Sequence, residues 1–233
     1  MLKIPNLVIF DLDNTLYDYD TANYFGNLAL AKYLSQNLKI SPSYILKDLE
    51  LSRDRVKATL GQTASSHSRL LYIRDFLNRN EVFFHSTFAL ECEQIYWREF
   101  LDNSELFSGV IDFIGLLRLN RIKTFLVTDF TTNIQLRKIS WFKLEKSFDL
   151  IVTSEEAGGD KSTGRPESLL KSFVQLSDEE VWSIGDMEYD HIFSTQSTFL
   201  KKVKSKGFRN YGDRKYEFSS YLDLLSNFES LQN

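Results

Sequence analysis

The sequence has few of the residues that build disulfides, zinc sites or membrane spans. It contains one cysteine, Cys92, so no disulfide can form within the chain. Its three histidines are widely spaced, which argues against a zinc site built on histidine. No apolar run is long enough to cross a bilayer, and the first residues do not resemble a secretory leader. We therefore expect a soluble, cytoplasmic protein that does not associate with membranes.

The chain also lacks a strong excess of charge and a proline-rich linker. The net charge is −4 and only three prolines occur, so nothing favours nucleic-acid binding or a flexible connection between parts. By contrast, hydrophobic residues make up 42% of the 233 residues, with 19 Phe and 11 Tyr, which is enough to fill a sizeable core. We expect one large domain or a core with a smaller attached module.

Short apolar runs alternate with helical stretches over most of the chain. Strands are predicted at 7–10, 122–127, 148–152, 181–184 and 198–203. Helices are predicted at 110–119, 131–139, 167–176, 188–195 and 218–228. This alternation predicts an α/β fold with a doubly wound, parallel, Rossmann-like sheet.

One long segment, 18–103, interrupts this alternation because it contains no convincing strand. Residues 21–38 have apolar side chains at helical spacing, and Ser41 followed by Pro42 is a typical helix start. Further helices are predicted at 66–78 and 84–101. We interpret the segment as an α-helical cap inserted into a core made of residues 1–17 and 104–233.

Polar side chains follow four of the predicted strands, at or soon after the point where each strand ends. They are Asp11, Asp13, Thr128, Asp129, Lys161, Arg165, Asp186 and Asp190. Because the carboxyl ends of parallel strands meet at one edge of a sheet, we expect these side chains to converge. Carboxylates bind Mg²⁺ through oxygen, and a cation and a hydroxyl orient a phosphate, so the set suits metal-assisted phosphoryl transfer.

The order of these groups resembles the four motifs of the haloacid dehalogenase-like (HAD) hydrolase superfamily. Residues 11–16, Asp-Leu-Asp-Asn-Thr-Leu, resemble motif I, and residues 126–129, Leu-Val-Thr-Asp, resemble motif II. Residues 185–190, with Gly-Asp at the start and Asp at the end, resemble motif IV. The resemblance covers the core, and the helical segment resembles the family's type-1 caps in position. It implies an Mg²⁺-dependent phosphatase that acts on a small phosphorylated metabolite, either a sugar phosphate or a nucleoside monophosphate.

The resemblance also implies roles for the four carboxylates of motifs I and IV. Asp11 would be the nucleophile that forms an aspartyl-phosphate, and Asp13 would protonate the leaving oxygen and later activate water. Mg²⁺ would be held by the Asp11 carboxylate, the backbone carbonyl of Asp13 and Asp186, with support from Asp190.

The phosphate site implied by motifs II and III leaves one choice open. Thr128, next to Asp129, and a basic residue would hold the phosphoryl oxygens. Spacing from the preceding strand favours Lys161 as the motif III cation. Arg165, which precedes Pro166 at a predicted helix start, is the alternative because the family often has Lys-Pro there.

Other functions remain open at this point. A phosphomutase of the same superfamily would also use paired aspartates, whereas a dehalogenase is disfavoured by the acid at Asp13. A catalytically silent binding protein with the same fold is a further alternative. In the predicted cap, Arg69 and Arg74 are candidates for contact with an anionic substrate, although an ordinary amphipathic helix is the simpler interpretation. Tyr17 and Tyr19 are candidates for lining the entrance. The substrate and the oligomeric state do not follow from the sequence.

Overall fold

The computed structural model describes residues 2–82, 86–174, 180–205 and 207–232. The chain folds into two compact units. The first, called the sheet unit below, comprises Met1–Asp18 and Glu105–Asn233, and the second, called the helical unit, is Tyr19–Ser104.

The sheet unit is built on a sheet with strand order β3-β2-β1-β4-β5-β7-β6. The strands are β1 (Leu7–Phe10), β2 (Lys123–Thr128), β3 (Leu150–Thr153), β4 (Val181–Gly185), β5 (Ser197–Lys202), β6 (Arg209–Gly212) and β7 (Lys215–Phe218). Neighbouring strands run parallel, except that β6 is antiparallel to β7. The predicted α/β fold with a mostly parallel, Rossmann-like sheet is therefore confirmed.

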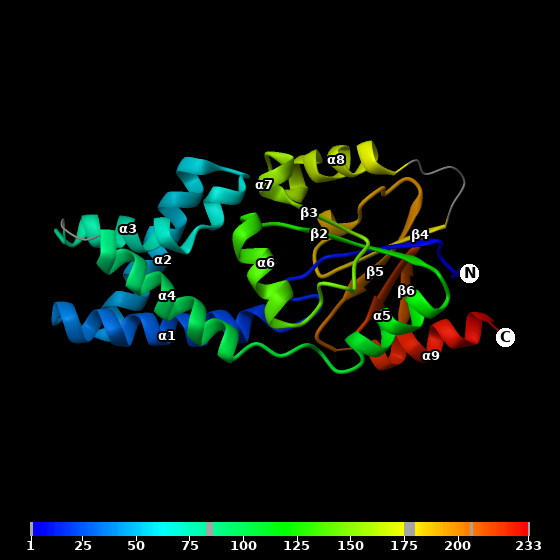
Figure 1. Ribbon diagram of the computed structural model, residues 1–233, viewed down its shortest axis with the longest axis horizontal. Coiled ribbons are helices and arrows are strands. Elements are labelled where there is room, and N and C mark those ends of the chain that lie inside the picture. Colours follow the sequence, from blue (N-terminus) through cyan, green and yellow to red (C-terminus); the bar gives the residue numbers. More distant parts are fainter. Residues whose placement is uncertain (1, 83–85, 175–179, 206, 233) are drawn as a thin grey trace. The chain divides into compact units, whose positions relative to one another are not determined.

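Strand β1 shows why both faces of this sheet are buried. Leu7 and Ile9 pack in a cluster with Leu170 of α8 (Arg165–Phe173). Phe10 points to the other face, where its ring lies 6.3 Å from that of Phe113 in α5 (Val110–Leu119). Figure 1 shows α5 beside α9 (Tyr221–Gln232) on one side of the sheet and α8 on the opposite side. Helices that cover both faces explain why the central strands are continuous apolar runs.

Two further helices of the sheet unit each follow a strand of the sheet. They are α6 (Thr132–Trp141), which follows β2, and α7 (Ser154–Ala157), which follows β3. Thr153 caps α7 by accepting a hydrogen bond from the backbone N–H of Glu156 at 3.3 Å. The helices α6 and α7 therefore begin within a few residues of the carboxyl ends of β2 and β3.

The prediction of a helix at 188–195 is wrong. The segment forms only a single 3₁₀ turn, Glu188–Asp190, followed by further turns. The Asp190 carboxylate accepts a hydrogen bond from the backbone N–H of Met187 at 2.8 Å, and this bond folds the segment back toward the strand end. Ile192 and Phe193 are then buried against the sheet.

The strands β6 and β7 were not predicted from the sequence. They form a short hairpin at the edge of the sheet and carry charged residues such as Arg209 and Glu217, so they lack an apolar run. The last helix begins at Tyr221 rather than at Phe218, because Phe218 belongs to β7. Residues 175 and 176 of the predicted helix 167–176 lie outside the described residues.

The helical unit consists of helices only, within the residues that are described. They are α1 (Tyr19–Leu38), α2 (Pro42–Leu60), a 3₁₀ helix (Ala64–His67), α3 (Arg69–Arg79) and α4 (Ser86–Asp102). Ser41 caps α2 as predicted, and residues 84 and 85 of the predicted fourth helix are outside the described part. Helix α1 approaches α4 closely at Gly26, where a Cβ would lie 2.9 Å from the Tyr96 ring.

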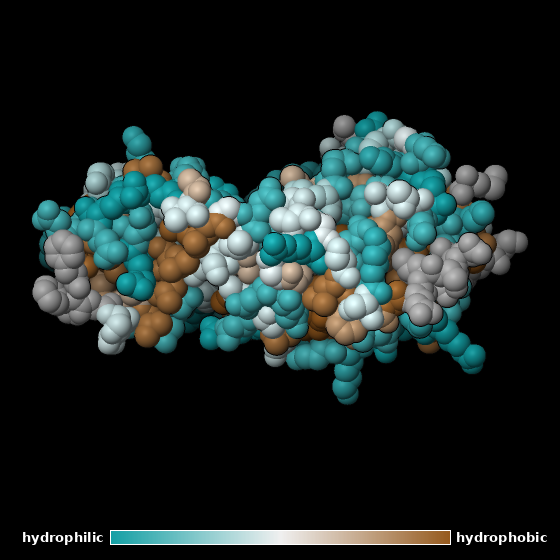
Figure 2. Space-filling view, turned by 90° about the horizontal axis from the view of Figure 1, so that it is seen from above, coloured by the Kyte–Doolittle hydropathy of each residue, from teal (hydrophilic) through white to brown (hydrophobic). Residues whose placement is uncertain are grey.

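Polar residues predominate on the face of the molecule seen in Figure 2. Figure 2 shows one face on which hydrophilic side chains cover most of the area and apolar side chains form smaller patches. Of the helices in the described part of the chain, none has both the length and the apolar character of a membrane span.

Candidate active site

The chain turns sharply after β1 and presents two carboxylates. The backbone N–H of Asp11 still continues the sheet by donating to the carbonyl of Ile184 at 2.8 Å. The backbone then reverses, with the N–H of Leu16 donating to the carbonyl of Leu12 at 2.9 Å and Asn14 at a φ of +59°. Asparagine adopts this left-handed conformation more easily than most residues. The turn therefore holds Asp11 and Asp13 at the carboxyl end of β1.

Asp11 is buried among charged groups from distant parts of the chain. It accepts hydrogen bonds from Lys161 Nζ and, at 2.9 Å, from Thr15 Oγ1. Lys161 also forms an ion pair with Asp190 at 2.5 Å. Burial raises the pKa of Asp11, Lys161 opposes this, and the carboxylates of Asp190 and Asp186 raise it further, so it lies well above the usual range. One lysine does not neutralise this group, which therefore favours a further cation or a proton.

Three carboxylates form a group that could hold a metal ion. Asp11, Asp186 and Asp190 each offer an oxygen, and these oxygens lie within 4.8 Å of one another. An all-oxygen set of this kind suits Mg²⁺. Burial and Asp190 raise the pKa of Asp186 to about 6, as expected for carboxylates that lie together without a counter-ion. The side chain of Asp13 is outside this group.

The side chain of Asp13 is held by three donors within the sheet unit. It accepts hydrogen bonds from Lys138 Nζ at 2.7 Å, from Gln135 Nε2 at 3.0 Å and from the Tyr17 hydroxyl. Burial raises the pKa of Asp13, but the charge of Lys138 and the three hydrogen bonds outweigh it, so the pKa lies below its ordinary value. In this arrangement Asp13 is a carboxylate, which is the form that accepts a proton.

Thr128 and Asp129 lie next to these carboxylates at the end of β2. The hydroxyl of Thr128 is buried and accepts a hydrogen bond from Gln135 Nε2 at 2.6 Å. Asp129 Oδ1 accepts a hydrogen bond from the backbone N–H of Lys161 at 2.8 Å. Asp129 therefore helps to place the segment that carries Lys161.

The structure separates the two candidates for the motif III cation. Lys161 is buried and reaches Asp11, whereas Arg165 is exposed and donates to the backbone carbonyl of Gly158. A 3₁₀ turn at Lys161–Thr163 precedes α8 and directs the lysine toward the strand ends. Arg165 is thus not brought to the carboxylates.

Sequence reasoning missed the donors that surround Asp13. Gln135 and Lys138 lie three residues apart on α6 and therefore share one helix face. Lys138 is fully buried, with its Nζ 4.4 Å from the centre of the Phe130 ring. The sequence did contain a signal for these donors. A glutamine and a lysine lie on one face of the helix that follows a strand ending at the site. Tyr17, expected to line an entrance, is instead buried in the sheet unit.

We expect that the acidic group can pack in its observed arrangement only if residue 185 is a glycine. A Cβ at this position would overlap the Asp190 side chain, so Gly185→Ala should displace Asp190 and cost about 1–3 kcal/mol through overpacking. We expect the variant to lose the Mg²⁺-induced rise in melting temperature. The control is Gly115→Ala on α5, where a Cβ meets nothing within 4 Å. Equal stabilisation of both variants by Mg²⁺ would contradict the assignment.

Removing one carboxylate should stabilise the metal-free protein in a pH-dependent way. The pKa of Asp186 is raised to about 6, so its ionisation above that pH opposes folding. In the presence of a metal chelator, Asp186→Asn should raise the free energy of unfolding by about 1–3 kcal/mol at pH 7, because each unit of pKa shift corresponds to about 1.4 kcal/mol. This gain should shrink as the pH falls from 6 to 4, because the wild-type carboxyl then binds a proton. Thermal unfolding at a series of pH values tests this, and a gain independent of pH would refute it.

Loss of the Lys138 charge should raise the pKa of Asp13. We expect Lys138→Met to lower kcat/KM for an aryl phosphate and to move the acid limb of its pH profile to higher pH. Lys138→Arg keeps the charge and should retain a profile nearer to that of the wild type. Lys143→Met removes an exposed lysine and is the matched control. An unshifted acid limb in Lys138→Met would show that the ion pair does not set the protonation of Asp13.

The sequence pattern of the family described as haloacid dehalogenase-like hydrolase matches residues 8–199. A curated relative, the ribulose-1,5-bisphosphate 5-phosphatase of Halopiger xanaduensis, is 29% identical over 180 residues, which are 77% of this chain and 75% of the relative. The family and this relative support a phosphoric monoester hydrolase.

Solved structures share the fold at low sequence identity. The HAD hydrolase YfnB from Bacillus subtilis, in a magnesium-bound crystal form, is 16% identical with a TM-score of 0.63 over 97% of this chain and 99% of its own. A 2-haloacid dehalogenase from Pseudomonas syringae pv. Tomato DC3000 is 18% identical with a TM-score of 0.65 over 100% of both chains. The family match covers most of the chain, and we conclude that this protein belongs to the haloacid dehalogenase-like hydrolases.

Proposed function

We propose that the protein is an Mg²⁺-dependent phosphatase that hydrolyses a small phosphorylated metabolite through an aspartyl-phosphate. The observation that carries this proposal is the placement of Asp11. Its carboxylate lies beside a buried lysine and two further carboxylates, Asp186 and Asp190, while a second acid, Asp13, is on the same turn. A nucleophile, a cation, a metal-binding group and an acid–base residue are thus combined at one sheet edge.

The chemistry consists of two displacements at phosphorus. In the first, an oxygen of Asp11 forms a bond to phosphorus while the bond to the leaving oxygen breaks, and Asp13 gives its proton to that oxygen. In the second, water attacks phosphorus, Asp13 takes the proton from the water, and the bond between phosphorus and Asp11 breaks. Free phosphate and an alcohol leave, and both carboxylates regain their starting states.

The surroundings of Asp13 favour its role in the second displacement. Lys138, Gln135 and Tyr17 hold it as a carboxylate, which is the form needed to accept a proton from water. The first displacement needs the protonated form. A phosphate bound nearby brings negative charge, which raises the pKa of a neighbouring carboxyl and so favours protonation. The same residue can serve both displacements because the charge beside it changes.

The residues present fit a magnesium ion. Asp11, Asp186 and Asp190 would hold it with their carboxylates, together with the backbone carbonyl of Asp13. When bound, Mg²⁺ offsets the repulsion between the phosphate and the carboxylates. The magnesium found in the related YfnB structure supports this choice. Lys161 and the Thr128 hydroxyl would bind the phosphoryl oxygens.

The substrate is proposed to be a sugar phosphate. The relative from Halopiger xanaduensis is named for a phosphorylated pentulose, which favours a sugar phosphate over a nucleoside monophosphate. We also propose that residues 18–103 act as a cap that selects the substrate, while 1–17 and 104–233 carry the chemistry. Asp13 favours phosphate chemistry over dehalogenation.

Loss of the nucleophile provides the direct test. We expect Asp11→Asn to lower the rate of Mg²⁺-dependent phosphate release from an aryl phosphate by at least a thousandfold, while the far-UV circular dichroism is unchanged. Asp112→Asn, on the exposed side of the first turn of α5, should keep the wild-type rate. A panel of sugar phosphates, with and without Mg²⁺, then identifies the substrate class.

Two results would refute the proposal. One is wild-type activity in Asp11→Asn, which would remove the assigned nucleophile. The other is a wild-type protein that releases no free phosphate from the aryl phosphate or from any member of the panel. Transfer of the phosphoryl group back to a sugar, without release of phosphate, would identify a mutase instead.

A further inference from the structure

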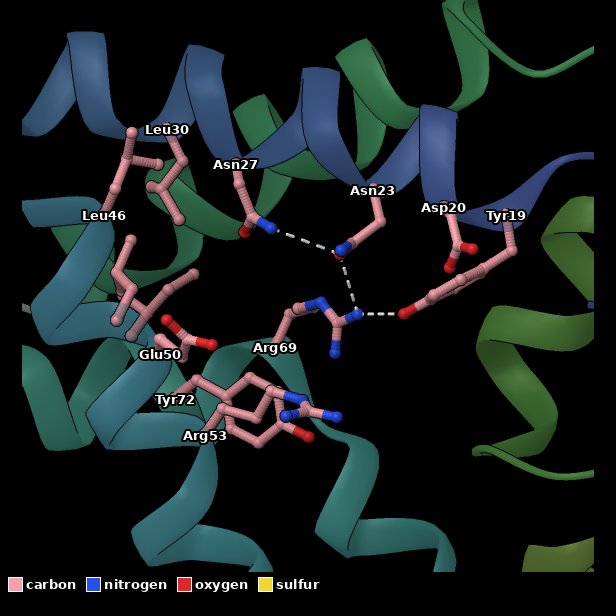
Figure 3. Close-up of a pocket in the computed structure, with 12 residues that line it drawn as sticks. Tyr19, Asp20, Asn23, Asn27, Leu30, Leu46, Glu50, Arg53, Arg69 and Tyr72 are labelled. Carbon is pink, nitrogen blue, oxygen red and sulfur yellow. Dashed lines mark hydrogen bonds between the residues drawn. The ribbon is translucent and has the colours of Figure 1, made fainter. Parts of the chain in front are cut away.

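Two buried polar side chains, one in each unit, differ in how well they are paired. In the helical unit, α1, α2 and α3 line a pocket of about 320 Å³ that contains Arg69 (Figure 3). The Arg69 guanidinium donates hydrogen bonds to the Tyr19 hydroxyl and, at 3.1 Å, to Asn23 Oδ1. In the sheet unit, the side-chain oxygen Oε1 of Gln135 is buried and has no hydrogen-bond partner among the described residues. An unpaired buried acceptor is costly, so the presence of this amide calls for a functional explanation.

The amino group of Gln135 lies among three oxygen atoms. Its Nε2 is 2.6 Å from Thr128 Oγ1, 2.7 Å from the backbone carbonyl of Asp129 and 3.0 Å from Asp13 Oδ2. A carbonyl and a carboxylate accept hydrogen bonds and do not donate them, so the amide must present its NH₂ group to both. Turning the amide by 180° would bring Oε1 against these acceptors. The contacts therefore fix which end of the amide faces the end of β2, and Oε1 is left unpaired as a consequence.

The helix that carries Gln135 is anchored at its start. Gln135 is fully buried, and its backbone N–H donates to the Thr131 carbonyl at 3.1 Å. The hydroxyls of Thr132 and Thr153 form a hydrogen bond at 2.7 Å, and the Thr132 N–H donates to Glu155 Oε2 at 2.7 Å. These contacts fasten the start of α6 to the end of β3. A buried side chain on a helix that is fixed in this way can hold a neighbouring group in one orientation.

The contacts of Gln135 determine where the Thr128 hydroxyl can donate its proton. A hydroxyl has one proton, and Thr128 Oγ1 uses a lone pair to accept the bond from Gln135 Nε2. Its own proton is directed to the backbone carbonyl of Asp129 at 3.4 Å, which is long for a hydrogen bond. That carbonyl already accepts the closer bond from Gln135. The Thr128 proton is therefore held weakly and can be donated to a ligand oxygen at little cost.

We propose that Gln135 is a positioning residue that makes the Thr128 hydroxyl a hydrogen-bond donor to a phosphoryl oxygen. The inference rests on the proposed function and extends it to a residue that does not itself touch the substrate. Without the amide, the hydroxyl would donate fully to the Asp129 carbonyl, and a lone pair of Oγ1 would face the phosphate. Because two oxygens that face each other through lone pairs repel, the direction of this one proton decides whether Thr128 stabilises the transferred group.

A double-mutant cycle with an aryl phosphate tests this proposal. Thr128→Val removes the donor and should lower kcat/KM for Mg²⁺-dependent hydrolysis about a hundredfold, as loss of one donor to a developing charge does. Gln135→Met removes the amide at similar volume and should lower kcat/KM about tenfold to a hundredfold. The double variant should lie within about twofold of Thr128→Val, because Gln135 acts through that hydroxyl. Losses that multiply would show a purely structural role or a role through Asp13, and would overturn the proposal.

The same substitution at another glutamine provides the matched control. Gln196 is exposed and directly precedes β5, at the end of the sheet opposite to the carboxylates. Gln196→Met should therefore keep the wild-type kcat/KM. A loss in Gln196→Met equal to that in Gln135→Met would show that the effect is not specific to the buried amide, and would contradict the assignment.

Binding of inorganic phosphate gives a second measurement that does not depend on turnover. In titration calorimetry with Mg²⁺, Gln135→Met should bind inorganic phosphate about tenfold more weakly than the wild type, and about as weakly as Thr128→Val. Unchanged affinity in a folded Gln135→Met protein would overturn the proposal. Phosphate binding that depends on both residues, in a protein that hydrolyses no phosphate ester, would defeat the proposed function alone. Hydrolysis with multiplying losses would defeat only the further inference.

The wild-type protein covers the case in which Gln135→Met does not fold. The NMR resonance of the Thr128 hydroxyl proton is identified by its loss in Thr128→Val. Addition of inorganic phosphate with Mg²⁺ should move this resonance downfield, because a weak bond to the Asp129 carbonyl is replaced by a charge-assisted bond to a phosphate oxygen. A resonance that stays in place while phosphate binds would refute the donor role of Thr128 and with it the role of Gln135.

Discussion

The ion pairs of the buried Lys161 hold the candidate site together. Its ammonium group contacts Asp11 and Asp190, which come from segments far apart in the sequence, at a place where carboxylates alone would repel one another. Burial of unpaired charges is costly, so the strand ends can converge only if a cation lies between them. The same arrangement leaves the carboxylates in excess, which is why the pKa values of Asp11 and Asp186 are raised. The lysine allows the group to form, and the remaining negative charge favours a further cation or a proton there.

The two motif I carboxylates lie in different environments because a second lysine contacts only one of them. Lys138 lies on α6 and contacts Asp13, so the pKa of Asp13 is lowered while that of Asp11 is raised. The pKa of Asp11 is raised because burial and the neighbouring carboxylates outweigh Lys161, whereas the charge of Lys138 and the hydrogen bonds to Asp13 outweigh burial there and lower its pKa. Opposite shifts of neighbouring acids are typical of sites in which one group acts as nucleophile and another transfers protons. The division of labour proposed for the pair therefore has a structural cause in the residues beyond motif I.

The helical unit combines a structural ion network with a pocket that carries a fixed charge. Arg79 joins α3 to α2 through Asp48 at 2.5 Å and also contacts Asp75 at 2.8 Å, which stabilises the helix pair that forms the pocket wall. Arg69, at the other end of α3, lies among tyrosines instead. Of the three arginines of α3, Arg79 therefore bridges the helix pair, Arg69 is buried among aromatic rings, and Arg74 is exposed.

The sequence by itself determined the mostly parallel sheet, the helical character of the segment inserted after the first strand, and most of the polar residues found at the strand ends. These follow from local features: apolar runs such as residues 7–10, a helix cap at Ser41, and carboxylates placed directly after a strand. Only the tertiary structure brings Lys161, and not Arg165, to Asp11, because a turn of a few residues sets which cation reaches that carboxylate. It also placed Lys138 and Gln135 against Asp13 and folded residues 188–195 into turns instead of a helix. Such outcomes depend on contacts between segments distant in the chain, where burial and charge pairing outweigh local propensity.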